Sequence, residues 1–228
     1  MFVVHALWSP GRGVLLWGDH AEASELPARL RRAPLEHRDG ARLAVPDLVP
    51  PGLLNGALAR AFNEAYFRRA PARETVTFEG IGPYFHPLDA VRAWNRLYGP
   101  RGFVQYQAVV PEDGAVRELL EGLGGTSSFL AVLKRFGAGT GMLSFPMPGW
   151  TLALDIPVGD TGLARRLDAL DEVVARARGR VYLAKDARVR PELLAAMYPE
   201  LDRWRAIQRS VDPDGVMCSD LSMRLGLT

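Results

Sequence analysis

The sequence predicts an α+β fold in which an antiparallel sheet is flanked by helices and followed by a helical C-terminal tail. Short apolar runs with alternating polarity, typical of strands, recur between segments with helical periodicity. The turns between them are short, and some of the predicted strands contain arginine. Charged residues in strands favour an antiparallel sheet with one face in water over a parallel sheet that is buried on both faces. A hydrophobic content of 48% and a charged content of 24% are ordinary for a globular protein.

The N-terminal part begins with two short apolar runs separated by Ser9-Pro10-Gly11-Arg12, a pattern that predicts a hairpin. The stretch from Glu22 to Pro51 is rich in arginine and proline, so it is predicted to be loop with a short strand at Ala41 to Val45. An apolar stripe at helical spacing predicts a helix from Gly52 to Arg69.

The rest of the chain alternates between the two kinds of element. Proline at the first position and Gly99 after the last predict a helix from Pro87 to Tyr98. Later strands and helices follow from periodicity: strands at 102–110, 129–136 and 150–158, and helices at 113–123 and 161–176. The tail from Pro191 to Leu227 is predicted to be helical, with breaks at Pro199 and Pro213.

Composition excludes several classes of function. The net charge is +2 and no basic run is interleaved with aromatic residues, so nucleic acid is not an expected partner. Cys218 is the single cysteine, which excludes an internal disulfide and a thiolate metal site, and the histidines lack metal-ligand spacing. No run is long enough to span a bilayer and Met1 to Ser9 does not resemble a signal peptide. A cytoplasmic location is expected, with a peripheral position at a membrane left open.

Lysine is nearly absent from the chain. Of 28 basic residues only Lys134 and Lys185 are lysines, and Lys185 ends an apolar run that starts at Val181. A lysine ammonium is a compact charge whose pKa shifts readily on burial, unlike that of a guanidinium. The spacing of the two lysines alone favours the interpretation that they remain by chance in a sequence biased toward arginine, over the interpretation that Lys185 is functional.

Two glutamines lie on one face of the strand at 102–110. Strand alternation places Phe103, Gln105 and Gln107 on one side and Val104, Tyr106 and Ala108 on the other. In the strand at 150–158, the same alternation places Thr151, Ala153 and Asp155 on one face. Burial of an amide without a hydrogen-bond partner costs free energy of folding. The glutamine face is therefore either exposed to solvent or the wall of a polar pocket that binds hydroxyl groups.

A glycine cluster at Gly137 to Gly141 follows a predicted strand. Pro146 and Pro148 prevent the following residues from opening a helix, so the cluster is predicted to be a turn and not a phosphate-binding loop.

The ordered set of motifs along the chain resembles one known family. These motifs include Phe62-Asn63-Glu64, Trp94-Asn95-Arg96-Leu97-Tyr98-Gly99, Leu143-Ser144-Phe145-Pro146, Val181 to Asp186 and Ser219-Asp220-Leu221. Together they resemble the substrate-binding and C-terminal half of the FAD-linked oxidases related to decaprenylphosphoryl-ribose 2'-oxidase, enzymes of the vanillyl-alcohol-oxidase superfold. The resemblance covers nearly the whole chain except its first ten residues.

The resemblance implies FAD as the cofactor and a division of the chain into two parts. Residues 1–180 correspond to the substrate-binding domain, and residues 181–228 to a C-terminal segment that would complete a flavin-binding domain. The N-terminal FAD-binding domain of the family is not expected in this sequence. A separate FAD-binding polypeptide, a reductase partner and a lipid-linked sugar are the partners that this arrangement implies.

The resemblance also implies the site residues. Lys185 would lie beside the flavin and the substrate as the catalytic residue, with Tyr182 also at the cofactor, although on a strand Tyr182 would face away from Lys185. The implied substrate contacts are Gln105, Gln107, Lys134, Phe85 and His86. His86 is a candidate base, but a histidine at such a position is more often a surface or helix-entry residue. Ala153 stands where some members carry a reactive cysteine.

Three hypotheses follow for function. The first is half of an oxidoreductase that oxidises a secondary sugar alcohol, a pentose on a polyprenyl phosphate, and that needs a flavin-binding half for activity. The second is a non-catalytic module that binds a glycolipid or a protein. The third is a remnant whose tail helices expose apolar surface and drive self-association.

Overall fold

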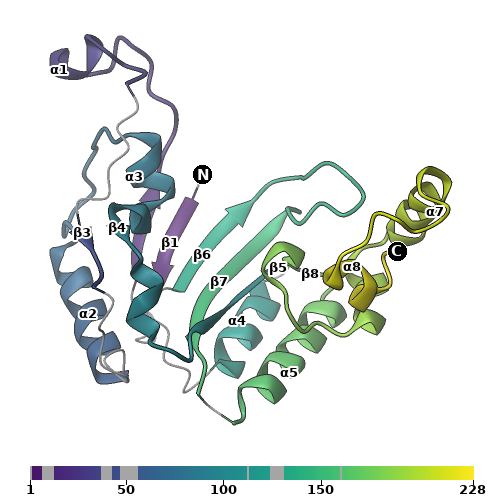
Figure 1. Ribbon diagram of the computed structural model, residues 1–228. Helices are drawn as coiled ribbons and strands as arrows, with labels where there is room; N and C mark the ends of the chain where they lie inside the picture. The colour runs from purple at the N-terminus through teal and green to yellow at the C-terminus, as the bar shows by residue number, and fades with distance from the viewer. Residues whose placement is uncertain are drawn as a thin grey trace.

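The computed structural model describes residues 2–6, 13–36, 43–46, 56–111, 113–123, 131–159 and 161–228, and it has the predicted architecture (Figure 1). Within these residues a six-stranded antiparallel sheet has the order β2-β1-β6-β7-β5-β8. Its strands are β1 (Phe2–Ala6), β2 (Gly13–Trp17), β5 (Phe103–Val110), β6 (Ala131–Phe136), β7 (Gly149–Pro157) and β8 (Arg180–Val181). The antiparallel sheet and the N-terminal hairpin are therefore confirmed, while the hairpin turn lies outside the described residues.

Between and after these strands the described residues form helices, most of them short. The α-helices are α1 (Ala28–Arg31), α2 (Gly56–Arg69), α3 (Ile81–Phe85), α4 (Asp113–Gly122), α5 (Leu163–Arg176), α6 (Leu194–Met197), α7 (Leu201–Val211) and α8 (Asp220–Leu225). Four short 3-10 helices complete the described set: η1 (Pro87–Ala90), η2 (Trp94–Tyr98), η3 (Leu183–Lys185) and η4 (Pro191–Leu193). The helical tail with its two breaks is confirmed.

Two predictions for the N-terminal half were wrong in detail. The predicted helix at 87–98 is two 3-10 turns, because Ala93 adopts a left-handed conformation with φ 55°. Between them β4 (Val91–Arg92) pairs in parallel with β3 (Leu43–Ala44), which lies within the strand predicted at 41–45 and ends before Val45. The predicted loop also contains the single turn of α1. Residues 41–42, 52–55 and 129–130 of the predicted elements lie outside the described residues.

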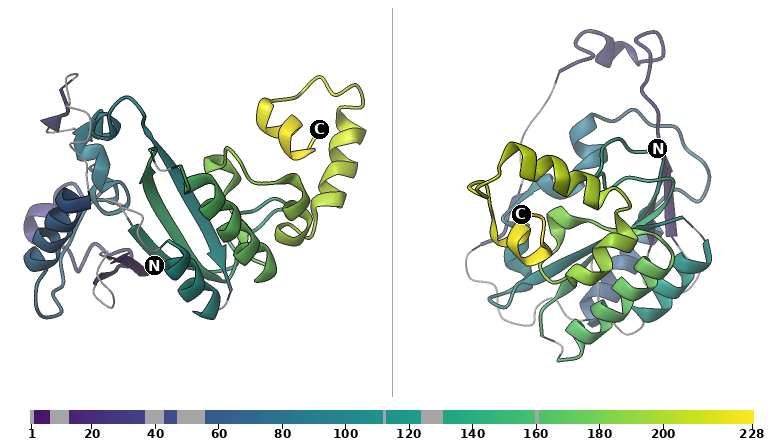
Figure 2. Two further views of the ribbon diagram at one scale, coloured as in Figure 1. Left: turned by 90° about the horizontal axis from the view of Figure 1, so that it is seen from below. Right: turned by 90° about the vertical axis from the view of Figure 1, so that its right-hand side faces the viewer.

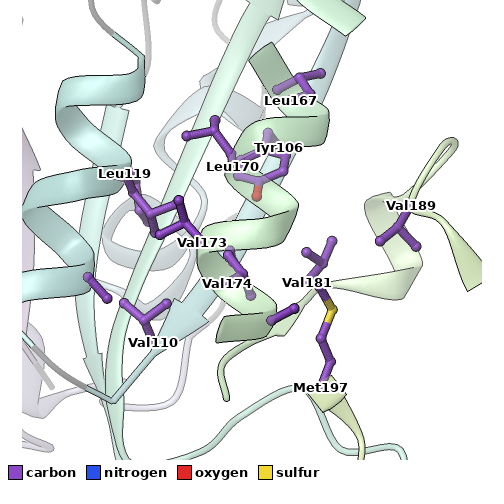
Figure 3. Close-up of a cluster of buried hydrophobic side chains, with 14 of the residues drawn as sticks. Tyr106, Val110, Leu119, Leu167, Leu170, Val173, Val174, Val181, Val189 and Met197 are labelled. Carbon is purple, nitrogen blue, oxygen red and sulfur yellow. The ribbon is translucent and has the colours of Figure 1, made fainter. Parts of the chain in front are cut away.

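The hydrophobic core lies between one face of the sheet and the pair α4 and α5 (Figure 2, left). Strand side chains such as Tyr106 and Val110 pack there against Leu119 of α4 and Leu170 of α5 (Figure 3). Burial of each such side chain stabilises the fold by about 1.5–3 kcal/mol. This layer therefore determines which face of β5 and β7 is buried against the helices and which face can carry polar side chains.

The same core continues into the C-terminal tail. Val181, Met197, Leu201 and Leu225 belong to one buried cluster with the strands and α5. The buried Tyr198 hydroxyl donates a 2.7 Å hydrogen bond to the carbonyl of Val181. The residues on both sides of position 180 thus share a single core, and the role of 181–228 in completing a flavin-binding domain stays a prediction.

Gly179 permits the close approach of β8 to β5. A Cβ at this position would lie 2.3 Å from the Val109 carbonyl oxygen and 2.9 Å from Val110 Cγ1. We expect Gly179→Ala to lower the free energy of unfolding by about 2–4 kcal/mol, because β8 must shift away from the core. Urea unfolding checks this, with Gly114→Ala as the matched control, since no atom lies within 4 Å of a Cβ there. Equal stability of the two variants would contradict the prediction.

Candidate functional site

The polar face of the sheet is the side opposite α4 and α5. Cross-strand register places Gln105 opposite Asp155 and Gln107 opposite Ala153. Lys134 of β6 is opposite Thr151 of β7. Because directly opposed residues share a face, these side chains form one polar surface, and the predicted alternation of β5 and β7 is confirmed.

Both glutamine amides are held by β7. Gln105 Nε2 donates to Asp155 Oδ1 at 2.9 Å, and Gln107 Nε2 donates to Thr151 Oγ1 at 3.2 Å. Asp155 and Thr151 are buried, with 3% and 1% of their surface exposed, while the glutamines are half-buried. The glutamine face is therefore an ordered hydrogen-bonded surface.

Lys185 lies in a 3-10 turn and not on a strand. The sequence predicted an extended run from Val181 to Asp186, but β8 ends at Val181. The backbone N–H of Tyr182 still donates to the Gln107 carbonyl at 2.8 Å, and the chain then turns. Desolvation lowers the pKa of the Lys185 ammonium, and the nearby Asp155 carboxylate opposes this effect.

The two lysines of the chain are electrostatic neighbours. Burial lowers the pKa of Lys134, and the positive charge of Lys185 lowers it further. Burial also raises the pKa of Asp155, against the opposing effects of the Gln105 hydrogen bond and the Lys185 charge. Sequence reasoning assigned Lys134 and Lys185 to the site separately, and the structure brings their charges close enough to interact.

A cavity of about 300 Å³ lies along β5, beside the segment that follows β8. Gln105, Gln107, Tyr182 and Lys185 all line it. The expectation that Tyr182 faces away from Lys185 was therefore wrong, since it assumed a strand where the chain forms a turn.

Tyr182, which lines the cavity, belongs to a cluster of aromatic rings. Tyr182 stacks on Phe145 with ring centroids 4.5 Å apart, and Phe145 meets Phe136 edge-on at 5.8 Å. Arg180 donates to the Ser144 and Pro146 carbonyls, which holds the loop that carries Phe145. The turn prediction for the glycine cluster before this loop is confirmed, since no helix follows it.

A second aromatic cluster lies at the start of β5. Tyr98 stacks on Phe103 at 4.3 Å, and Trp94 contacts both rings. Burial, and secondarily the negative charge of Asp155, raise the pKa of Tyr98 well above its usual range. The Tyr98 hydroxyl therefore stays protonated at physiological pH.

The segment after Lys185 is fixed by a buried carboxylate. Asp186 accepts hydrogen bonds from the backbone N–H groups of Arg188 and Val189 at 3.0 and 2.8 Å. Arg224 of α8 donates to the same carboxylate at 2.5 Å and to the Val189 carbonyl at 2.7 Å. Arg188 in turn pairs with Asp171 of α5 at 2.9 Å. The last helix thus helps to position the turn that carries Lys185.

Phe85 and His86 lie apart from this cavity. They end α3, whose Tyr84 lies beside Gly18, just after β2 at the opposite edge of the sheet from β8. Both side chains are exposed and neither lines the cavity. Their contact with substrate stays a prediction.

Sequence reasoning missed Asp155, Asp186 and Arg224 as functional residues. Alternation placed Asp155 on the polar face, and a carboxylate directly opposite a glutamine could have been recognised once the strand pairing was known. The Asp186–Arg224 contact spans 38 positions, so no local pattern could have indicated it.

The described part of the chain contains no group of three or more His, Cys, Asp or Glu side chains suited to a metal ion. Across those same residues, no helix is both long and apolar enough to cross a bilayer.

The lowered pKa of Lys134 predicts a pH dependence of stability. The folded state binds fewer protons than the unfolded state between the folded pKa and the usual 10.5, so the free energy of unfolding rises with pH through that alkaline range. We expect Lys134→Met to flatten this rise and to stabilise the protein at pH 7 by less than about 1 kcal/mol, since the side chain is half-exposed. Urea unfolding at pH 7 and in the alkaline range measures both effects. Parallel pH profiles for the two proteins would contradict the prediction.

The sequence of the chain is similar to those of several known proteins. Residues 160–225 match the family described as D-arabinono-1,4-lactone oxidase. The chain is 40% identical, over 95% of its length, to the decaprenylphosphoryl-beta-D-ribose oxidase of Mycolicibacterium smegmatis, and it covers 48% of that protein. It is 43% identical, also over 95% of its length, to an uncharacterized protein in the mprA 5' region of Streptomyces coelicolor, and it covers 62% of that protein. The chain therefore spans about half to three-fifths of the curated relatives that it matches.

The similarities are thus to oxidases, over residues 160–225 for the family match and over nearly the whole chain for the mycobacterial relative. More particularly, the chain is similar to part of decaprenylphosphoryl-beta-D-ribose oxidase, and the resemblance inferred from the sequence motifs is confirmed.

Proposed function

We propose that the chain is the substrate-binding half of an FAD-dependent oxidoreductase that oxidises a secondary sugar alcohol. A pentose linked to a polyprenyl phosphate is the proposed substrate, by analogy with the name of the mycobacterial relative. The observation that supports this most is the placement of both glutamines and both lysines around one polar sheet face, beside a cavity.

The residues present fit a flavin. The Tyr182 ring, backed by Phe145, offers a flat surface at the cavity, and the Lys185 ammonium lines the same space. FAD, when bound, supplies the acceptor for the hydride of the carbinol carbon. The compact charge of Lys185 would stabilise negative charge at the flavin edge, because the partly desolvated site strengthens electrostatic interactions.

The glutamines are proposed to bind the sugar. Their amides can donate to and accept from hydroxyl groups, and their anchoring by Asp155 and Thr151 leaves little reorganisation for binding. Lys134 is proposed to add a second positive charge to the substrate side of this face. Oriented contacts of this kind hold a secondary alcohol where its hydride can be transferred.

The proposed partners follow from the chemistry. A FAD-binding region would hold most of the cofactor, and a separate FAD-binding polypeptide is the partner that we propose for it. Each oxidation leaves a reduced flavin, so oxygen or a partner reductase must remove two electrons per turnover.

The visible absorbance spectrum after incubation with FAD and gel filtration tests the proposal. Flavin absorbance that co-elutes with the chain, alone or with a flavin-binding partner, would support it, and sugar alcohols that bleach this absorbance would establish the reaction. A flavin-loaded assembly that no sugar alcohol reduces would contradict the proposed oxidation.

A binding module without catalysis is the second candidate. Its supporting observation is the exposed apolar surface of the tail, where Val211, Val216 and Met217 are each more than three-quarters exposed. A chain that never retains flavin, with or without a partner, would favour this candidate. Light scattering separates it from self-association, because a clean monomer would exclude association through the tail.

A further inference from the structure

The orientation of the Gln105 amide is dictated by its partner. An ionised carboxylate can only accept hydrogen bonds, so the atom that Gln105 turns toward Asp155 Oδ1 must be the donor Nε2. The carbonyl oxygen of Gln105 is then directed elsewhere. Gln105 lines the cavity, and its carbonyl is the part of the amide that Asp155 does not engage.

Gln107 differs from Gln105 in this respect. Its partner is the Thr151 hydroxyl, which can donate or accept, so the amide of Gln107 is free to reverse at little cost. The amide orientations of the two neighbouring glutamines are thus set differently, and only that of Gln105 depends on the negative charge of Asp155.

Asp155 has unused hydrogen-bonding capacity. It is 3% exposed, and among the described residues its buried Oδ2 atom has no hydrogen-bond partner. A buried acceptor without a partner is costly, which makes such groups in native structures candidates for a functional role. The charged or titratable groups that act on or respond to Asp155 are Lys185 from η3 and Tyr98 from η2, and Lys134 of β6 interacts with Lys185.

We propose that Asp155 sets the hydrogen-bond polarity of the cavity, so that it accepts polyols which donate a hydroxyl hydrogen to the Gln105 carbonyl beside Lys185. The proposal rests on the proposed function, because it names what selects a sugar alcohol at this site. Asp155 is a positioning residue in this scheme, since it acts on the ligand through Gln105. Replacement by asparagine supplies a side chain that can also donate, and the Gln105 amide is then free to reverse.

Side-chain NMR tests the positioning role without flavin or substrate. The chain contains three glutamines, Gln105, Gln107 and Gln208, so selective ¹⁵N labelling gives one pair of amide signals for each. We expect Asp155→Asn to move the Gln105 pair and to accelerate its hydrogen exchange, while the Gln208 pair stays unchanged. Thr151→Val is the matched variant, and it is expected to move the Gln107 pair and not the Gln105 pair.

Selective labelling of lysine adds a second readout. Lys134 and Lys185 give the only two lysine side-chain signals, and Lys134→Met assigns them. Loss of the Asp155 charge is expected to lower the pH at which the Lys185 signal titrates. A Gln105 pair and a Lys185 titration that are both unaffected by Asp155→Asn would overturn the positioning role.

Paired ligands test the selectivity. The probes are methyl β-D-ribofuranoside and its 2-deoxy analogue, titrated against the same Gln105 and Lys185 signals. We expect the wild-type chain to bind the ribofuranoside roughly tenfold or more tightly, and Asp155→Asn to reduce this preference to about twofold or less, because a pocket arranged to bind a hydroxyl discriminates against its absence.

The outcomes separate the two proposals. Equal binding of both glycosides by the wild type, or binding of neither, would overturn the selectivity for a hydroxyl donor. Preserved selectivity and a sensitive Gln105 signal, together with a flavin-loaded assembly that oxidises no sugar alcohol, would leave the role of Asp155 intact and contradict only the proposed function.

Discussion

Lys185→Ala is expected to reduce kcat/KM of the flavin-loaded assembly by at least about 100-fold. Removal of a single preorganised donor at a developing negative charge typically costs 10²- to 10³-fold in kcat, and Lys185 shares the cavity with Gln105, Gln107 and Tyr182. Lys185→Arg is expected to recover part of the rate, since a guanidinium keeps the charge but not the compact shape of the ammonium.

The measurement is steady-state oxidation of a sugar alcohol by the assembly that retains flavin absorbance. Arg176→Ala is the matched control, because it removes an exposed cation that pairs with Glu118 far from the cavity, and unchanged kinetics are expected for it. Circular dichroism shows that the folds are retained. Unimpaired turnover of Lys185→Ala would remove Lys185 from the mechanism.

Arg224→Ala is expected to lower the free energy of unfolding by about 2–3 kcal/mol. Arg224 neutralises the Asp186 carboxylate, whose side chain is 3% exposed, and loss of one partner leaves a buried charge uncompensated. The arginine itself is 31% exposed, which places the expected cost somewhat below that of a fully buried pair. Val189 also loses the hydrogen bond to its carbonyl.

Urea unfolding measures this effect, and Arg203→Ala on α7 is the matched control. Arg203 pairs with Glu200 at 3.0 Å on the surface with 71% of its side chain exposed, so a loss below about 0.5 kcal/mol is expected. Similar losses for the two variants would show that the Arg224–Asp186 contact does not stabilise the tail.

The strands that carry the site could be predicted because their patterns are strong. In β5 and β7 apolar residues alternate with Gln105, Gln107, Thr151 and Asp155, and a period of two has only one interpretation on a sheet with a single buried face. The faces were therefore correct before any pairing was known.

The turn at Lys185 and the break at Ala93 could not be predicted in the same way. The run from Val181 to Lys185 is apolar enough for a strand, but its pairing with β5 ends at the hydrogen bond from the Tyr182 N–H to the Gln107 carbonyl, and Asp186 then contacts Arg224 of α8. Ala93 adopts φ 55° because Val91 and Arg92 pair with β3, which is a contact between distant segments. In both places tertiary pairing overrides local preference.

Amine-directed reagents should act on this protein with unusual selectivity. Both of its lysines, Lys134 and Lys185, belong to one polar face, and both have lowered pKa values that increase the fraction of free amine. Acylating or aldehyde reagents at mildly alkaline pH would therefore modify the candidate site and the N-terminal amine, while arginines elsewhere stay intact. Amine coupling to a sensor surface would block the very cavity whose ligands such a sensor is meant to measure.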